Sequence, residues 1–218
     1  MVEQPKWILA ATRLCVAFDA VSRPYGKDAA PPMGREKSVV SLLPEVLSAA
    51  TPIEYLDSLA MRMAEIGAYG LAVPVCCEVI KRLAADSARK EMRAYFFNDL
   101  AMFLLAAGDP RCIECGLKAL RLNTDSGRRV RILGRMGEFY CVAYRDWTRA
   151  AKHYGAALRL GEATNYDPGK LHWVRERLFE LELDRQGLSQ LFESRRQEMQ
   201  VMSTAYADLL RETVVPGL

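Results

Sequence analysis

Residues 131–161, RILGRMGEFYCVAYRDWTRAAKHYGAALRLG, constrain the fold more than any other stretch of the chain. The two halves of this segment are predicted to form helices joined by a tight turn at Arg145 and Asp146. In the second half, small and large apolar residues recur at spacings of three and four, as they do on one face of a helix. A small residue at a close approach of two helices, with an aromatic residue one turn away, predicts a helical hairpin. The apolar positions are Gly137 and Tyr140 in the first half, and Ala150, Tyr154, Ala157, Leu158 and Leu160 in the second.

Two earlier segments repeat this arrangement of small residues. The small residues of the first helices are Ala60, Ala101 and Gly137, and those of the second helices are Ala72, Cys112 and Ala150. Successive positions are separated by 41 and 36 residues in the first set and by 40 and 38 in the second. Over residues 54–161 the pattern resembles the tetratricopeptide repeat, whose period is about 34 residues. The resemblance implies a right-handed superhelix of antiparallel helical hairpins, which acts as a scaffold for binding other proteins.

The composition and the positions of turn-forming residues predict an all-α protein. Half of the residues are apolar, and alternation typical of strands is scarce. We expect N-terminal helices in residues 1–50 around an exposed Pro/Gly loop at 23–37, then repeats in 51–165, and a capping hairpin in 166–218. Turns are expected at Gly67, at Gly108–Asp109 and after Asn165, and a break at Gly187. Pro52, in the first turn after Thr51, marks the clearest helix start. The three parts are expected to form one continuous domain.

No residue pattern predicts catalysis, a metal or a cofactor. Cys112 and Cys115 form a C-x-x-C motif, but no strand pattern accompanies it and no second cysteine pair completes a zinc site. Buried structural thiols are therefore the better interpretation. His153 and His172, the two histidines, have no nucleophile or paired carboxylate at a suggestive spacing, and no phosphate-binding glycine loop is present. We expect a protein that is not an enzyme.

Basic residues on the predicted first helix of the third repeat form the main polar cluster. Arg131 and Arg135 are four residues apart and share a helix face. The resemblance places them in a concave groove, at the two positions that are basic in the carboxylate-clamp members of the family. The other clamp positions hold Asp57, Met61 and Asp99 instead of a lysine and two asparagines. We therefore expect a groove of mixed charge that prefers a peptide carrying both signs over an acidic chaperone tail.

The predicted groove contacts are Arg131, Arg135, Arg128, Asp99, Asn98 and Asp57, with Tyr140 at the groove wall. Two simpler interpretations stay open: the arginines form a solvated face, or they pair with Asp99 across repeats. A small secretion-type chaperone of the same architecture is a more specific variant of the adaptor hypothesis.

Charge and hydropathy limit the classes of partner. The formal net charge is only +3, but residues 111–159 contain eleven Lys or Arg against four Asp or Glu. This basic stretch supports an alternative, a regulatory protein associated with nucleic acid, although no recognition helix is evident. Another alternative is a structural subunit that docks through residues 1–37, and the terminal helices are candidates for a homodimer surface. No apolar run approaches the roughly 20 residues of a membrane helix. A cytoplasmic protein with reduced thiols is expected.

Overall fold

The structure of the chain is a computed structural model, and it describes residues 6–22, 35–48, 51–65, 67–85, 89–183, 187, 190 and 204–217. Within these ranges the chain forms helices and their connections and no β-strand, so the predicted all-α class is confirmed for them. No helix in the same ranges is long and apolar enough to cross a lipid bilayer. Contacts divide the chain into two compact units. The first comprises residues 1–79 and 202–216, and the second residues 80–201 and 217–218.

The first unit is built around α2 (Arg35–Val46), against which α1 (Lys6–Ser22) and α11 (Thr204–Glu212) both pack. Helix α2 turns Val39, Leu43 and Val46 inward at spacings of four and three, and each is buried. Because α2 begins at Arg35, the predicted loop ends earlier than residue 37. Residues 23–34 of that loop lie outside the described part of the chain.

Helix α3 (Ile53–Glu65) packs against α1 through an aromatic residue. The ring centroid of Tyr55 lies 5.4 Å from that of Trp7, and its hydroxyl oxygen lies 3.5 Å from the Cys15 sulfur. Helix α3 follows Pro52 as predicted, and the chain turns at Gly67, whose φ of 79° favours glycine. Helix α4 (Tyr69–Ala84) follows and extends past the boundary between the two units.

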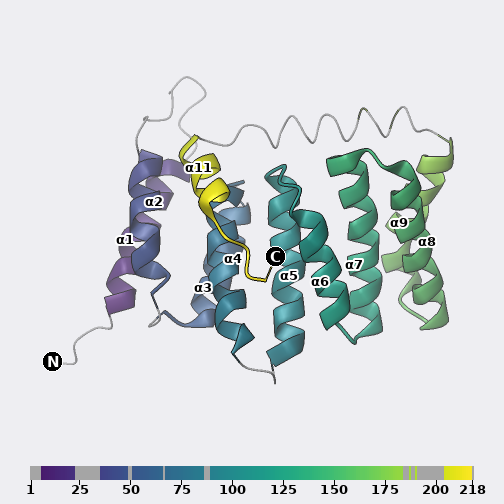
Figure 1. Ribbon diagram of the computed structural model, residues 1–218, viewed down its shortest axis with the longest axis horizontal. Helices are drawn as coiled ribbons and strands as arrows, with labels where there is room; N and C mark the ends of the chain where they lie inside the picture. The colour runs from purple at the N-terminus through teal and green to yellow at the C-terminus, as the bar shows by residue number, and fades with distance from the viewer. Residues whose placement is uncertain are drawn as a thin grey trace. The chain divides into compact units, whose positions relative to one another are not determined.

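After the end of α4, the described part of the second unit contains two antiparallel hairpins and α9 (Figure 1). Helices α5 (Lys90–Ala106) and α6 (Cys112–Leu122) form the first hairpin. The second hairpin joins α7 (Ser126–Phe139) and its π-helical extension η2 (Tyr140–Tyr144) to α8 (Trp147–Ala163). Helix α6 packs against α7, and α9 (Pro168–Leu183) packs against α8. The predicted helices and turns of residues 94–183 are therefore present.

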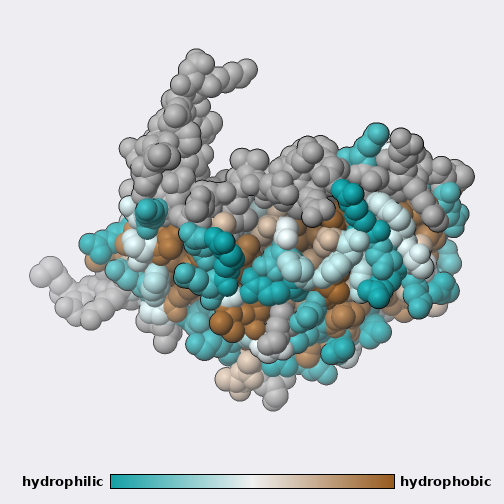
Figure 2. Space-filling view, turned by 45° about the horizontal axis from the view of Figure 1, so that its top comes forward, coloured by the Kyte–Doolittle hydropathy of each residue, from teal (hydrophilic) through white to brown (hydrophobic). Residues whose placement is uncertain are grey.

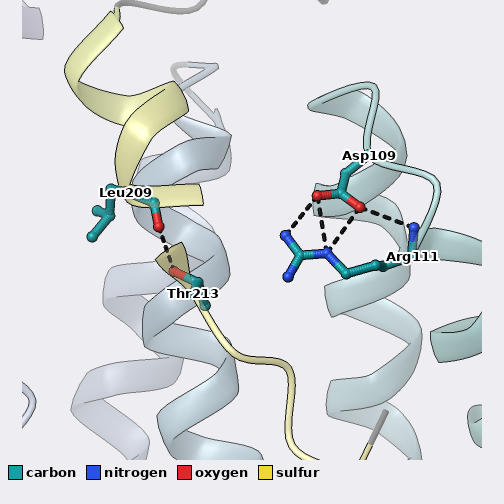
Figure 3. A network of polar contacts seen from close by, with 4 residues as sticks. All are labelled: Asp109, Arg111, Leu209 and Thr213. Atoms are coloured by element: carbon teal, nitrogen blue, oxygen red, sulfur yellow. Dashed lines mark hydrogen bonds and ion pairs between the residues drawn. The ribbon is translucent and has the colours of Figure 1, made fainter. Parts of the chain in front are cut away.

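Aspartates organise the connections in the second unit. Asp125 accepts a hydrogen bond from the Arg128 backbone N–H at 2.7 Å, and Asp146 accepts one from the Arg149 N–H at 2.9 Å. Each aspartate caps the start of a helix, where backbone donors have no partner in the helix. At the α5–α6 turn, Asp109 accepts hydrogen bonds from the backbone N–H and the guanidinium of Arg111 (Figure 3).

Glycines set how closely the helices of the second unit approach. A Cβ on Gly137 would lie 2.7–2.8 Å from ring atoms of Tyr154, which is fully buried. A Cβ on Gly134 would meet Trp173 of α9 at 2.6 Å, and one on Gly161 would meet Leu171 at 2.7 Å. Real Cβ atoms do not approach this closely, so the ring of Tyr154 occupies the space that the missing methyl group leaves on α7.

The C-terminal part of the chain differs partly from the expected capping hairpin. Helix α9 is the first predicted capping helix, and α11 ends near the expected residue, with the Thr213 hydroxyl donating to the Leu209 carbonyl at 2.7 Å (Figure 3). Gly187, where a break was expected, is helical. Residues 191–203 of the last predicted helix lie outside the described residues. The division between the two compact units falls inside α4.

Candidate functional site

Helices α5 and α7 run in the same direction, as four interactions between residues on these helices or next to their ends indicate. At their N-terminal ends, the Thr124 hydroxyl donates to the Glu91 carboxylate at 2.9 Å, and Arg128 lies 4.0 Å from the other oxygen of that carboxylate. Farther along, Asp99 is an electrostatic neighbour of Arg135. Beyond the C-terminal ends, the Tyr144 hydroxyl donates to the Pro110 carbonyl at 3.2 Å.

The contacts between α5 and α7 pair residues that are 33 to 37 positions apart. Because this offset stays nearly constant from one end of the helices to the other, the two hairpins are stacked in register. Residues that share a face on α5 therefore lie beside residues that share a face on α7. This parallel pair of helices provides the surface that we consider for function.

On α7, charged side chains recur at spacings of three and four. They are Arg128, Arg131, Arg135 and Glu138. Arg131 is exposed, whereas Arg135 is half-buried. Burial lowers the pKa of the Arg135 guanidinium, the Asp99 carboxylate opposes that shift, and the charge of Arg131 adds to it. Arg135 therefore sits between an opposite charge on α5 and a like charge on its own helix.

In the middle of α5, the polar side chains are Asn98 and Asp99. Asp99 is only 9 % exposed, and one of its carboxylate oxygens accepts a hydrogen bond from the Asn98 amide at 3.1 Å. A buried carboxylate requires compensation by hydrogen bonds or by an opposite charge. Asn98 and Arg135 supply these two kinds of compensation. Arg135 therefore has an opposite charge in its surroundings, whereas Arg131 is exposed to solvent.

Large apolar side chains are exposed on the same side of α5. Met92, Tyr95 and Met102 are 44 %, 43 % and 36 % exposed, and Asp99 lies between the last two at helical spacing. Glu91, which precedes Met92, lies 4.0 Å from Arg128 of α7, and the Tyr95 hydroxyl acts electrostatically on Arg135, so the two rows are neighbours. We call the two rows together the α5–α7 face. Its members are Met92, Tyr95, Asn98, Asp99 and Met102 of α5, and Arg128, Arg131, Arg135 and Glu138 of α7.

Five of the seven predicted groove residues belong to one surface of the second unit. Arg128, Arg131, Arg135, Asn98 and Asp99 belong to the α5–α7 face. Asp57 belongs to α3 of the first unit, where burial raises the pKa of its carboxyl. Tyr140 is buried against α8 and not placed as an open groove wall. Its ring stacks on His153 at a centroid distance of 5.1 Å, and the Arg149 guanidinium lies 5.7 Å from its centroid.

Sequence reasoning missed the exposed apolar row of α5. Met92, Tyr95 and Met102 fall between the core positions of that helix, which include Phe97, Leu100 and Leu104. A signal was present, because α5 has apolar residues nearly all round its circumference, and a helix on the surface of a protein usually has one polar side. Surface-exposed apolar side chains gathered on one face, unlike scattered ones, indicate an interaction site. In the view of Figure 2, hydrophobic side chains interrupt a largely hydrophilic surface.

The thiols of the second unit are buried. Burial is the main cause that raises the pKa of Cys112, Cys115 and Cys141 to about 12 in each case. At neutral pH these thiols are protonated, whereas redox chemistry and zinc binding both require the thiolate. Among the residues that the structure describes, no group of three or more His, Cys, Asp or Glu side chains could hold a metal ion.

The chain matches no protein-family model, and comparisons with curated proteins and with solved structures give no significant match.

Proposed function

We propose that this chain is a non-enzymatic adaptor that binds a peptide segment of another protein on the α5–α7 face. The observation that supports this function is the exposed apolar row of α5 beside the charged row of α7. Apolar side chains exposed next to arginine resemble the composition of protein–protein interfaces, in which aromatic residues, methionine and arginine are enriched. The mixture of Asp99, Glu138 and three arginines favours a partner that carries both signs of charge.

The proposal includes a relation to tetratricopeptide repeats. Its support is the packing of α5–α6 and α7–α8 as antiparallel hairpins, with α5 and α7 parallel at an offset of 33 to 37 residues. The small residues Ala101 and Gly137 are buried in the first helices of these hairpins, as a close approach of helices requires. A continuous right-handed superhelix that extends through residues 54–161 belongs to the same proposal. The proposal also includes a cytoplasmic location. The buried free thiols favour this location, because disulfides are rare in cytosolic proteins.

The test is a pull-down from source lysate at low and moderate salt with wild type, Arg131→Glu and Arg121→Glu. Arg121 is an exposed arginine on α6 and provides a matched charge reversal away from the α5–α7 face. Arg135 is left intact because a glutamate there would face Asp99. We expect Arg131→Glu to reduce the captured partner about tenfold, by removing one attraction and adding a repulsion. Arg121→Glu should retain the partner. Circular dichroism must show equal helicity in all three proteins.

Two results would contradict the adaptor function. A protein partner that binds Arg131→Glu as well as wild type would move the interaction away from the α5–α7 face. Capture of nucleic acid alone, released at moderate salt, would favour the nucleic-acid alternative, because binding to phosphates weakens steeply as salt rises.

A further inference from the structure

We infer that the segment bound on the α5–α7 face is an amphipathic helix. Its apolar side packs along Met92, Tyr95 and Met102, and a carboxylate at the edge of that side reaches Arg131. This inference rests on the proposed function and deepens it by naming the chemistry of the partner. It assigns most of the affinity to the apolar row of α5 and a smaller share to the charges of α7.

The apolar row is the part of the face that gains most from a partner. Met92, Tyr95 and Met102 each expose more than a third of their surface to water, and removal of apolar surface from water is the main favourable term in protein association. Methionine side chains are flexible and polarizable, so they adapt to the shape of an apolar partner. Tyrosine adds a large apolar ring that loses little conformational entropy when it is covered.

Most charges of the face are already compensated within the chain. Arg128 lies 4.0 Å from Glu91, and Arg135 has Asp99 as its opposite charge. Arg131 differs, because it is exposed and no ion pair between described residues includes it. Arg131 is therefore the cation of the face with the most to gain from a carboxylate of a partner. Arginine and carboxylate can form two parallel hydrogen bonds, which fixes the register of the bound segment.

The length and spacing of the row fit a helix. Met92 and Met102 are ten residues apart, which corresponds to about 15 Å along a helix with a rise of about 1.5 Å per residue. A partner helix of about three turns presents apolar side chains at positions i, i+3 or i+4, and i+7 over the same length. Asp99 interrupts the row but is nearly buried, so it does not prevent the approach of an apolar side.

The experiment selects peptides on the whole chain and then maps where they bind. A phage library of random 16-residue peptides is selected on the purified full-length protein, and enriched peptides are synthesised with a fluorescein label. Dissociation constants are measured by fluorescence anisotropy for wild type, Met92→Gln/Met102→Gln and Arg131→Gln. Leu9→Gln and Arg121→Gln are matched controls, because both side chains are exposed and lie on other helices. Circular dichroism verifies that every variant is folded.

The expected peptides have apolar residues at helical spacing and Asp or Glu at the edge of the apolar side. Met92→Gln/Met102→Gln should weaken their binding at least tenfold, and Arg131→Gln about threefold to tenfold. The two controls should change binding less than twofold. A proline at the centre of an enriched peptide should abolish binding, because it breaks a helix.

The contrary outcomes separate this inference from the proposed function. If the double methionine variant binds normally and Arg131→Gln does not, the adaptor function stands and the apolar docking of a helix is wrong. Tolerance of the central proline overturns the helical form of the ligand. If no peptide is enriched, or enriched peptides bind all variants equally, both proposals fail. If sedimentation shows that wild type self-associates and the methionine variant does not, the occupant is a second copy of this chain and the inference is overturned.

Discussion

At the scale of single residues, the packing of the second unit depends on glycines, whose lack of a side chain leaves room for large neighbouring side chains. Gly137 of α7 and Tyr154 of α8 illustrate this dependence, since the tyrosine ring fills the space where a Cβ would stand. Tyr154 is fully buried, so it has little room to move away. Protein interiors are packed as densely as organic crystals, and one added methyl group forces neighbours to shift.

Gly137→Ala is therefore expected to destabilise the protein. The new methyl group would lie 2.7–2.8 Å from the ring of Tyr154, and overpacking of this kind costs about 1–3 kcal/mol. Gly155→Ala on α8 is the matched control, because a Cβ there meets only the flexible end of Arg159, at 3.4 Å. Alanine in an unstrained helix should increase stability by about 0.5–1 kcal/mol. Urea unfolding followed by circular dichroism measures both, and equal effects of the two substitutions would contradict the packing argument.

The arginines show how far sequence predicts a site at this scale. The spacing of Arg131 and Arg135 predicts that they share a face; both lie on α7, and Asp99 acts electrostatically on Arg135. Spacing alone does not show that Arg135 is half-buried and Arg131 exposed, because that difference depends on neighbours from α5. Spacing alone likewise does not show that Tyr140, which was expected at a groove wall, is buried. Its burial depends on His153 and Arg149, which lie on α8, across the turn of the hairpin.

At the scale of elements, η2 is an irregular helix with a clear origin in the sequence. Gly137 and Ala150 of the third repeat are thirteen positions apart, whereas Ala60 and Ala72 are twelve apart and Ala101 and Cys112 eleven. A π-helical turn is wider than an α-helical turn and takes up one extra residue. The five residues Tyr140–Tyr144 adopt this form directly before Arg145, whose positive φ of 51° closes the turn. The surplus residue is therefore accommodated within the helix, and the turn itself stays tight.

Deletion of Ala143 should convert η2 into a continuation of α7. We expect the free energy of unfolding to change by less than about 1 kcal/mol, because Ala143 is only partly buried and the deletion restores regular helical geometry.

Deletion of Ala156 is the matched control. It removes one alanine from α8 and rotates all later residues by about 100°, which turns Ala157 and Gly161 away from their packing partners. That variant should lose more than about 3 kcal/mol or fail to fold. Thermal unfolding distinguishes the two deletions, and equal losses would show that η2 is required.

The helices and turns themselves were largely predictable, for local reasons. Glycines with positive φ mark the turns at Gly67 and Gly108, and aspartates cap α7 and α8. These signals act over a few residues and are visible in a sequence. The exposed apolar row of α5 was not predicted, because a periodicity analysis assigns apolar residues to the core. Only the packing of α5 against α6 and its other neighbours shows which of its apolar residues remain uncovered.

At the scale of the whole molecule, the two compact units lead to a prediction about independent folding. Residues 80–201 contain both hairpins and α9, and the glycine contacts that fix α7 against α8 and α9 all lie inside this range. A unit that contains its own core is expected to fold alone. The fragment 80–201 should therefore show helical circular dichroism, unfold cooperatively in urea and bind the selected peptides within about threefold of the full chain.

The matched control is the fragment 80–165, which lacks α9. Without Trp173 and Leu171, its Gly134 and Gly161 would lie open to water, so it should unfold at lower urea or aggregate. If 80–201 is unfolded while the full chain is stable, the second unit depends on the first. If instead 80–201 folds but does not bind peptides, the binding surface includes residues outside the α5–α7 face, among which Asp57 of α3 would be the first to test.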